Sequence, residues 1–193
     1  MKFQNLFLSS LLLAALALAG CSQQDASKPA TPAKQEVSVD VVAAQGKGFA
    51  VGAVMSNNTV YVFFDPQCPH CGHLWQTAAP LQRKLKFVWI PVGWVNASST
   101  TQAAALLTAS NPGALMTEHE ALLLDGKGGL SASSSVAPDV AQAIKNNTAL
   151  LTSFGAESVP FIVARNLKSG QTVSREGALE TAALAEFLGL DAP

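Results

Sequence analysis

Residues 59–71 read Thr-Val-Tyr-Val-Phe-Phe-Asp-Pro-Gln-Cys-Pro-His-Cys, and the prediction of the fold begins there. The first six residues are β-branched or aromatic, which is typical of a short strand buried on both faces of a sheet. The segment 65–67 breaks this strand. A helix is expected to begin at about Cys68 or Pro69 and to run to about Lys84, because proline is tolerated in the first turn of a helix.

Cys68 and Cys71 form a Cys-x-x-Cys pair at the predicted start of that helix. Unpaired backbone amides and the helix dipole favour negative charge at this position, and the thiolate is the attacking species in disulfide exchange. We therefore expect Cys68 to be the nucleophile and Cys71, one turn later and nearer the interior, to be the resolving thiol. His70 between them would stabilise the thiolate further. A stabilised thiolate favours the dithiol form and makes the disulfide oxidising.

Other interpretations of the cysteines are weaker. Cys68, Cys71 and His73 are three potential zinc ligands, with His119 as a fourth, but structural zinc sites usually use two cysteine pairs. A c-type haem site requires a histidine where Gly72 stands. A purely structural disulfide suits an exported chain, but a bridge across two intervening residues constrains the unfolded chain little. A zinc-binding lipoprotein is the alternative function, whereas the redox function requires no cofactor or metal.

The rest of the chain predicts an α/β fold. Val37–Val42 predicts either a strand or a short helix. Further strands are expected at 48–54, 87–90, 161–165 and 171–174, and further helices at 100–109, 112–124, 138–154 (as one or two helices) and 178–188. This order implies a sheet with a helical insertion at about residues 96–155.

Composition limits the class of protein. The chain has 193 residues, of which 49% are hydrophobic and 13% charged, with a formal net charge of −1. This length suits one elaborated domain, and the apolar fraction argues against disorder. The balanced charge and the absence of a basic run argue against nucleic-acid binding.

The first 20 residues are predicted to be a signal peptide. Lys2 precedes an apolar run that is too short for a confident transmembrane helix. Residues 18–21, Leu-Ala-Gly-Cys, resemble a bacterial lipobox. That resemblance implies cleavage before Cys21 and its lipidation, and Ser22 favours the outer membrane by resemblance to sorting rules. An ordinary signal peptide is the alternative. Residues 21–36 lack an apolar period and are expected to form a flexible tether before a folded domain at 37–193.

A second candidate element is Ser158-Val-Pro-Phe161, directly before a predicted strand. About 5–6% of X-Pro bonds are cis, so a proline here would by itself be expected to be trans. The Cys-x-x-Cys context favours cis. A cis bond would turn the Val159 backbone toward a neighbouring loop, where its amide and carbonyl could bind an extended substrate chain.

The stretch 60–71 resembles the thioredoxin-fold thiol:disulfide interchange proteins of the DsbC/DsbG branch. Residues 91–93 with 101–112 resemble the start of that branch's helical insertion, and 146–151 with 154–160 resemble its approach to the cis-proline loop. The resemblance covers about 48–190. It implies a thioredoxin-like fold with a helical insertion, Cys68 and Cys71 as the redox pair, and Pro160 as the cis-proline.

The sequence departs from that branch in three places. Only residues 21–58 precede the active-site strand, where the branch carries a dimerisation domain, so we expect a monomer. Pro69-His70 between the cysteines resembles the DsbA type, as does Val159 before Pro160, where the isomerase branch usually has threonine. Both features favour dithiol oxidation or a relaxed specificity. The expected lipid anchor also distinguishes the chain from soluble periplasmic members.

The sequence therefore predicts an exported, membrane-anchored thiol:disulfide oxidoreductase. Its expected partners are cysteine-containing envelope proteins and a membrane redox partner. We expect Trp75 to border the active site as a substrate contact. Asp65 is expected either to assist proton transfer from Cys71 or to cap the active-site helix. His73 and His119 are expected to be surface or structural residues.

Overall fold

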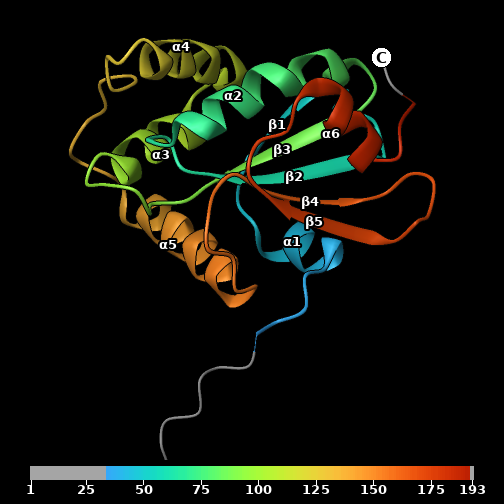
Figure 1. Ribbon diagram of the computed structural model, residues 1–193. Helices are drawn as coiled ribbons and strands as arrows, with labels where there is room; N and C mark the ends of the chain where they lie inside the picture. The colour runs from blue at the N-terminus through green and yellow to red at the C-terminus, as the bar shows by residue number, and fades with distance from the viewer. Residues whose placement is uncertain (1–33, 192–193) are drawn as a thin grey trace, which may run out of the picture. The chain divides into compact units, whose positions relative to one another are not determined.

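A mixed sheet of five strands runs through the centre of the fold, which the computed structural model describes for residues 34–191 (Figure 1). The strand order is β1-β3-β2-β4-β5. β2 and β3 are parallel, and the other neighbouring pairs are antiparallel. The strands are β1 (Phe49–Gly52), β2 (Thr59–Phe64), β3 (Lys86–Pro91), β4 (Phe161–Arg165) and β5 (Thr172–Glu176).

The predicted N-terminal features are mostly beyond this range. The signal peptide at 1–20, the lipidation site Cys21 and the tether up to residue 33 lie outside the described residues. Their assignments therefore stay predictions.

β2 occupies the middle of the sheet because its side chains have apolar surroundings on both faces. It pairs with β3 on one edge and with β4 on the other. Phe64 packs edge to face with Trp89, with ring centroids 5.6 Å apart, on one face of the sheet. Phe63 points to the opposite face and packs with Phe154 and Phe161. An apolar run without alternation is what a strand covered on both sides requires.

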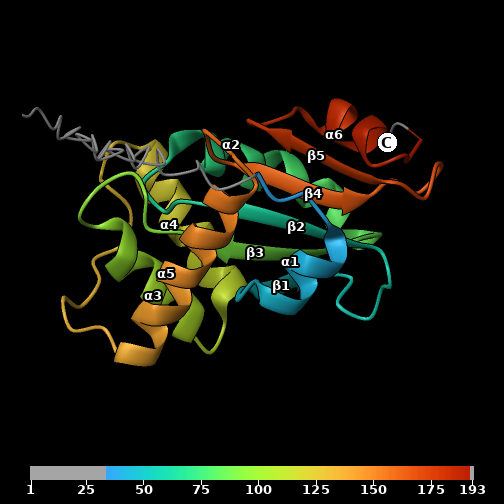
Figure 2. The same cartoon turned by 90° about the horizontal axis from the view of Figure 1, so that it is seen from below.

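Helices cover both faces of the sheet (Figures 1 and 2). One face carries α2 (Pro69–Ala78), the 3-10 helix η1 (Ala79–Arg83) and α6 (Thr181–Phe187). The other carries α1 (Val39–Gln45) and α5 (Pro138–Ser153). The undecided segment at 37–42 thus becomes helical from Val39, and the Ser38 side chain accepts a hydrogen bond from the Asp40 amide at its start.

The active-site helix is shorter than predicted. α2 ends at Ala78 and a 3-10 turn continues to Arg83, instead of one helix reaching Lys84. Pro80 explains the change, because a proline has no amide for an α-helical hydrogen bond and its ring collides with the preceding turn.

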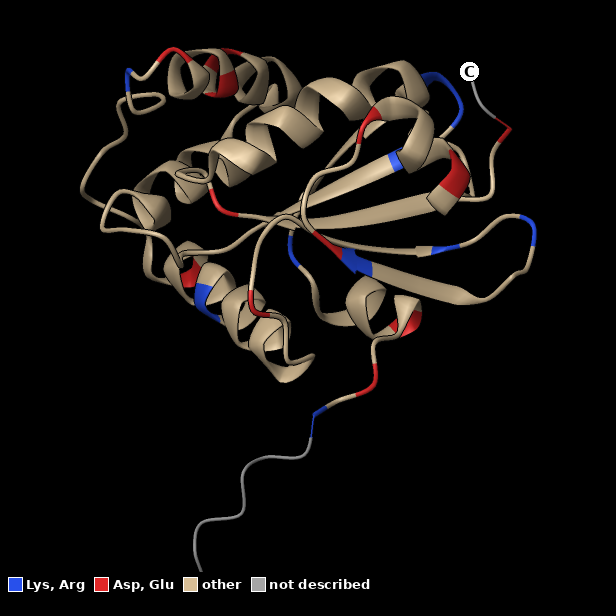
Figure 3. Cartoon of the chain, viewed as in Figure 1, with Lys and Arg blue, Asp and Glu red and all other residues tan. Residues whose placement is uncertain are grey.

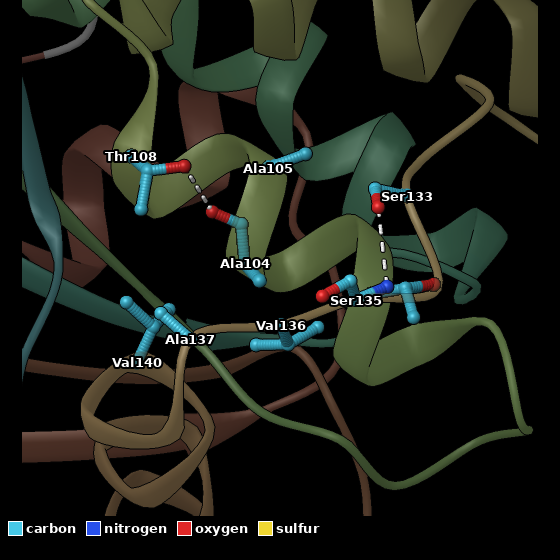
Figure 4. A pocket seen from close by; sticks show the side chains of 9 residues that line it. Ala104, Ala105, Thr108, Ser133, Ser135, Val136, Ala137 and Val140 are labelled. Atoms are coloured by element: carbon cyan, nitrogen blue, oxygen red, sulfur yellow. Dashed lines mark hydrogen bonds between the residues drawn. The ribbon is translucent and has the colours of Figure 1, made fainter.

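The helical insertion lies between β3 and β4, as predicted. It consists of α3 (Ser99–Thr108), α4 (Pro112–Leu124) and α5, which is a single helix. α4 packs against α2, and α3 packs against α5. A hollow of about 470 Å³ is lined by residues of α3 and of the segment 133–140 (Figure 4). Small and apolar side chains line it, with no cysteine or titratable group among them.

Charge is sparse and mixed on the fold. Figure 3 shows Lys and Arg dispersed among Asp and Glu over the helices and loops. Among residues 34–191, every helix is too short or too polar to cross a bilayer.

Candidate active site

Cys68 lies where the chain leaves β2 and enters α2. It is the N-cap residue of α2 and is 8% exposed. The amide of Cys68 donates to the Asp65 carbonyl at 3.0 Å, and the amide of Cys71 donates to the Cys68 carbonyl at 2.9 Å. This turn holds both thiols at the start of one helix.

The two thiols have opposite acidities. The Cys71 thiol donates a hydrogen bond to Cys68, which is the largest of the effects that lower the pKa of Cys68 from 9.0 to about 6. Burial acts against this shift, while the backbone at Cys71 and His70 and the charge of His70 add to it. Burial raises the pKa of Cys71 well above 9.0, and its hydrogen bond to Cys68 raises it further. The pair therefore consists of one readily ionised thiol and one that stays protonated.

The loop before β4 lies against the Cys68 thiol. Cys68 Sγ lies 3.4 Å from the carbonyl oxygen of Val159, although the two residues are 91 positions apart. The Val159–Pro160 peptide bond is cis. β5 holds this loop, because Glu176 accepts hydrogen bonds from the Ser158 hydroxyl at 2.6 Å and from the Glu157 amide at 3.2 Å.

Asp65 does not cap α2, which corrects one of the two roles expected for it. Cys68 is the N-cap residue, and no side chain caps that helix. Asp65 is fully buried and Oδ2 accepts from the amides of Trp94 and Val95 at 2.6 and 2.8 Å. Oδ1 accepts from the Ser99 hydroxyl at 2.7 Å and from the Gln67 amide at 2.8 Å. The carboxylate thus ties the turn before Cys68 to the beginning of the insertion.

Gln67 extends that connection. Its side chain receives a hydrogen bond from Asn96 at 3.0 Å and donates to the Gly128 carbonyl at 2.8 Å. Gln102 of α3 donates to the Gly128 and Leu130 carbonyls at 2.9 Å each. Neither glutamine is among the predicted site residues, because polar residues in a turn and on an Ala-rich helix carry no local signal for this network.

The three histidines occupy different environments. His70 and His73 are exposed on α2, and their rings are 6.5 Å apart. His119 is fully buried: one ring nitrogen meets the Pro66 carbonyl at 2.7 Å, and the other accepts from the Leu130 amide at 3.2 Å. Burial lowers the pKa of His119, so the neutral ring bridges two loops. A structural role was expected for it.

The zinc alternative finds no support. Within the part of the chain that the structure describes, no three His, Cys, Asp or Glu side chains are arranged to hold a metal ion. His119 uses both ring nitrogens for other partners.

The tryptophans are placed differently from one another. Trp75 is 7% exposed and packs on the buried Trp89 with ring centroids 5.0 Å apart. This packing favours a core role for Trp75 over the expected contact with substrate. Trp94 is 39% exposed, on the loop that Asp65 holds.

A buried acid missing from the predicted site residues lies behind the cysteines. Glu120 on α4 is 1% exposed, and among residues 34–191 neither carboxyl oxygen has a hydrogen-bond partner. Burial raises its pKa to about 9, and Cys68 contributes to the shift. The sequence carries no clear local signal for this acid, because apolar residues occur all around α4 and do not form one face.

Fold and site together define a thioredoxin-like protein with a paired dithiol at the start of its first long helix. No protein-family model matches the chain. Among solved structures, a periplasmic thioredoxin-like protein from Salmonella enterica serovar Typhimurium has a TM-score of 0.61 at 17% identity, covering 80% of this chain and 97% of that protein. At this identity the likeness establishes the fold.

Sequence relatives confirm the resemblance to the DsbC/DsbG branch. The chain is 31% identical over 148 residues to the thiol:disulfide interchange protein DsbG of Pseudomonas aeruginosa, covering 75% of this chain and 56% of that protein. It is 32% identical over 105 residues to DsbG of Escherichia coli, covering 53% of this chain and 42% of that protein. The chain thus spans about half the length of these curated relatives.

Proposed function

We propose that this protein is a thiol:disulfide oxidoreductase in which Cys68 is the nucleophile and Cys71 the resolving thiol. The observation that carries the proposal is the placement of the two thiols: Cys68 starts α2 with Sγ 3.4 Å from the Val159 carbonyl, and Cys71 is fully buried one turn later. This placement agrees with the lowered pKa of Cys68, about 6, and the raised pKa of Cys71. Near neutral pH one sulfur is ready to attack or to leave, while its neighbour holds a proton. Similarity to two DsbG proteins supports the same chemistry.

The reaction transfers two electrons between a substrate dithiol and the Cys68–Cys71 pair. In the oxidising direction, a substrate thiolate attacks Cys68 of the protein disulfide, and Cys71 leaves and binds a proton. A second substrate thiolate then attacks the substrate sulfur of the mixed disulfide. Cys68 leaves as a thiolate and the substrate disulfide is released. The low pKa of Cys68 makes it a good leaving group, which favours this direction.

Substrate contact is proposed at the loop before β4. The Val159 carbonyl lies beside Cys68 Sγ, so a chain joined to Cys68 would pass this backbone. His70 is exposed next to the nucleophile, where its charge favours the thiolate. Pro160 sets the course of the loop, and cysteine-containing envelope proteins are the proposed substrates.

Cysteine variants test the redox role. We expect Cys68→Ser to abolish disulfide exchange, and Cys71→Ser to accumulate mixed disulfides with a cysteine-containing peptide. Cys21→Ser is the matched control, because it changes a cysteine outside the proposed redox pair and should leave exchange by the purified protein unchanged. Near-full activity of both Cys68→Ser and Cys71→Ser would contradict the mechanism.

The reduction potential would establish the direction of electron flow. A value of about −120 mV would indicate an oxidant, and one of about −270 mV a reductant. It is obtained from the ratio of dithiol to disulfide protein in glutathione buffers of known ratio.

We also propose that the protein acts as a monomer held by a lipid on Cys21 at the periplasmic side of a bacterial membrane, with the outer membrane favoured. The sequence Leu-Ala-Gly-Cys at 18–21 and the following Ser22 support this. Fractionation of cells expressing the full chain should place it with the outer membrane, and Cys21→Ser should release it. Recovery of both forms in the same soluble fraction would contradict the anchor.

A further inference from the structure

Glu120, a residue of the helical insertion, packs against the active-site helix α2. It lies on α4, and its carboxyl group covers Gly72, the residue after Cys71. A methyl group added at Gly72 would lie 2.5 Å from Glu120 Oε2. Glycine therefore allows the acid to approach the helix that carries both thiols.

The carboxyl group has no compensation for its burial within the described residues. It is 1% exposed, and both oxygens lack a hydrogen-bond partner. A buried carboxylate without a hydrogen bond or a counter-charge is strongly unfavourable, so the neutral acid is preferred.

The titratable groups around it are few. On α2, Cys68 and Cys71 both interact with Glu120 electrostatically, while His70 and His73 are exposed. On α4, His119 uses both ring nitrogens on other partners, and Glu118 is exposed. The other elements packed on α4 are α3 and β1, whose sequences contain no titratable residue. The Asp65 carboxylate, behind the turn, already accepts hydrogen bonds from four donors.

Burial and Cys68 shift the pKa of Glu120, and no cation of the described residues is among the causes, so negative charges on Cys68 and Glu120 oppose each other. Burial is the larger cause of the raised pKa of Glu120, about 9 in the dithiol form, and the charge of Cys68 adds to it. In a disulfide form Cys68 would carry no charge, so the smaller contribution would disappear and the pKa of Glu120 would be lower, while burial would still raise it. At a pH between the pKa of Glu120 in the disulfide form and its pKa in the dithiol form, Glu120 is ionised in the disulfide form and neutral in the dithiol form.

We propose that Glu120 is a positioning residue for the redox reaction, which takes up a proton when the Cys68–Cys71 disulfide is reduced, so that the buried negative charge passes from Glu120 to Cys68. The inference rests on the proposed dithiol function. With glutathione as reductant, two thiols supply two electrons and two protons and form one glutathione disulfide. One proton binds Cys71, the other binds Glu120, and Cys68 becomes the thiolate, so atoms and charge balance.

The experiment compares the pH dependence of the equilibrium between protein and glutathione in the full chain, Glu120→Gln, Glu120→Asp and Glu118→Gln. Glutathione's own ionisation is common to all four. As the pH rises toward about 9, the constant for reduction of the full chain should fall relative to that of Glu120→Gln by up to about tenfold per pH unit, as one extra proton requires. Glu120→Asp keeps a carboxyl and should retain this extra dependence. Glu118→Gln, the exposed match on the same helix, should behave like the full chain.

A readout on the unaltered protein makes the test independent of how the variants fold. At a pH just below about 9, inside the window in which Glu120 changes its ionisation, the infrared difference spectrum between dithiol and disulfide forms should contain a protonated-carboxyl band on reduction, and Glu120→Gln should lack it. The pKa of Cys68 should be nearly the same in Glu120→Gln as in the full chain. Below pH 8 Glu120 of the dithiol form is a neutral acid, and the amide that replaces it is also uncharged.

Two outcomes would overturn the inference. One is an equilibrium constant for reduction that changes with pH in the same way in the full chain and in Glu120→Gln, even if the two constants differ by the same factor at every pH. That result would indicate a merely structural residue. The other is a difference spectrum without the band. A full chain with no reversible two-electron couple would instead refute the proposed function itself.

Discussion

At the scale of single residues, the acidity of Cys68 depends mainly on its partner thiol. The hydrogen bond from Cys71 is the largest effect that lowers the pKa of Cys68, and the charge of His70 is the smallest. The dipeptide between the cysteines therefore lowers the pKa of Cys68 more through its backbone than through the histidine charge. Backbone groups and the second sulfur contribute more.

This ranking predicts different effects for three substitutions. Cys71→Ala removes the donor and should raise the pKa of Cys68 from about 6 toward 9.0. Cys71→Ser retains a hydroxyl donor and should raise it less, and His70→Ala should raise it least. The pH dependence of the alkylation rate of Cys68 measures each value. Equal shifts in Cys71→Ala and His70→Ala would contradict the assignment.

At the scale of elements, one carboxylate joins the turn before α2 to the start of α3. Asp65 accepts four hydrogen bonds from Gln67, Trp94, Val95 and Ser99. The insertion is therefore attached to the catalytic turn itself, and does not merely pack against the thioredoxin-like core. His119 and Gln102 reinforce this attachment through the loops at 66 and 128–130.

Asp65→Asn should consequently lower the free energy of unfolding by at least about 2 kcal/mol. The amide replaces one acceptor oxygen with a donor, so it turns an NH₂ group toward backbone or hydroxyl donors. Asp125→Asn is the matched control, since Asp125 is exposed at the end of α4 and makes only a surface ion pair with Lys127. Its effect should stay within about 0.5 kcal/mol. Urea unfolding measures the free energy of unfolding of both variants. Equal values would contradict the role of Asp65 in attaching the insertion to the turn before α2.

At the scale of the whole molecule, redox state and stability are linked through two buried groups. The pKa of Cys68 falls from 9.0 to about 6 on folding of the dithiol form. Its ionisation therefore adds stability that is complete above pH 9.0 and is lost as the pH falls through about 6. Glu120 acts in the opposite sense, because its pKa rises from 4.5 to about 9 and its contribution declines as the pH rises between these values.

The two effects separate in Glu120→Gln. In that variant the stability of the dithiol form relative to the disulfide form should increase steadily from about pH 6 to about pH 9, because only Cys68 titrates there. In the unaltered protein the increase should be smaller. Thermal unfolding of both redox forms across this range measures the difference. A relative stability that does not change with pH in Glu120→Gln would contradict the linkage.

Much of the architecture follows from local patterns. The apolar run at 59–64 predicts a strand, the pattern at 112–124 predicts a helix, and those at 161–165 and 171–174 predict two further strands, all of which the structure contains. These signals are reliable because they depend on residues within a few positions of one another. The Cys-x-x-Cys pair and its place before a helix are local for the same reason.

Contacts between distant parts of the chain needed the folded molecule. The Val159 carbonyl beside Cys68, the Asp65 carboxylate on the start of the insertion, and Glu120 over Gly72 each join segments that no sequence period connects. A side chain's burial and its hydrogen-bond partners depend on which elements pack together. The spacing of the two cysteines thus indicated the chemistry, whereas the packing of the insertion set the electrostatic surroundings in which their protons and charges move.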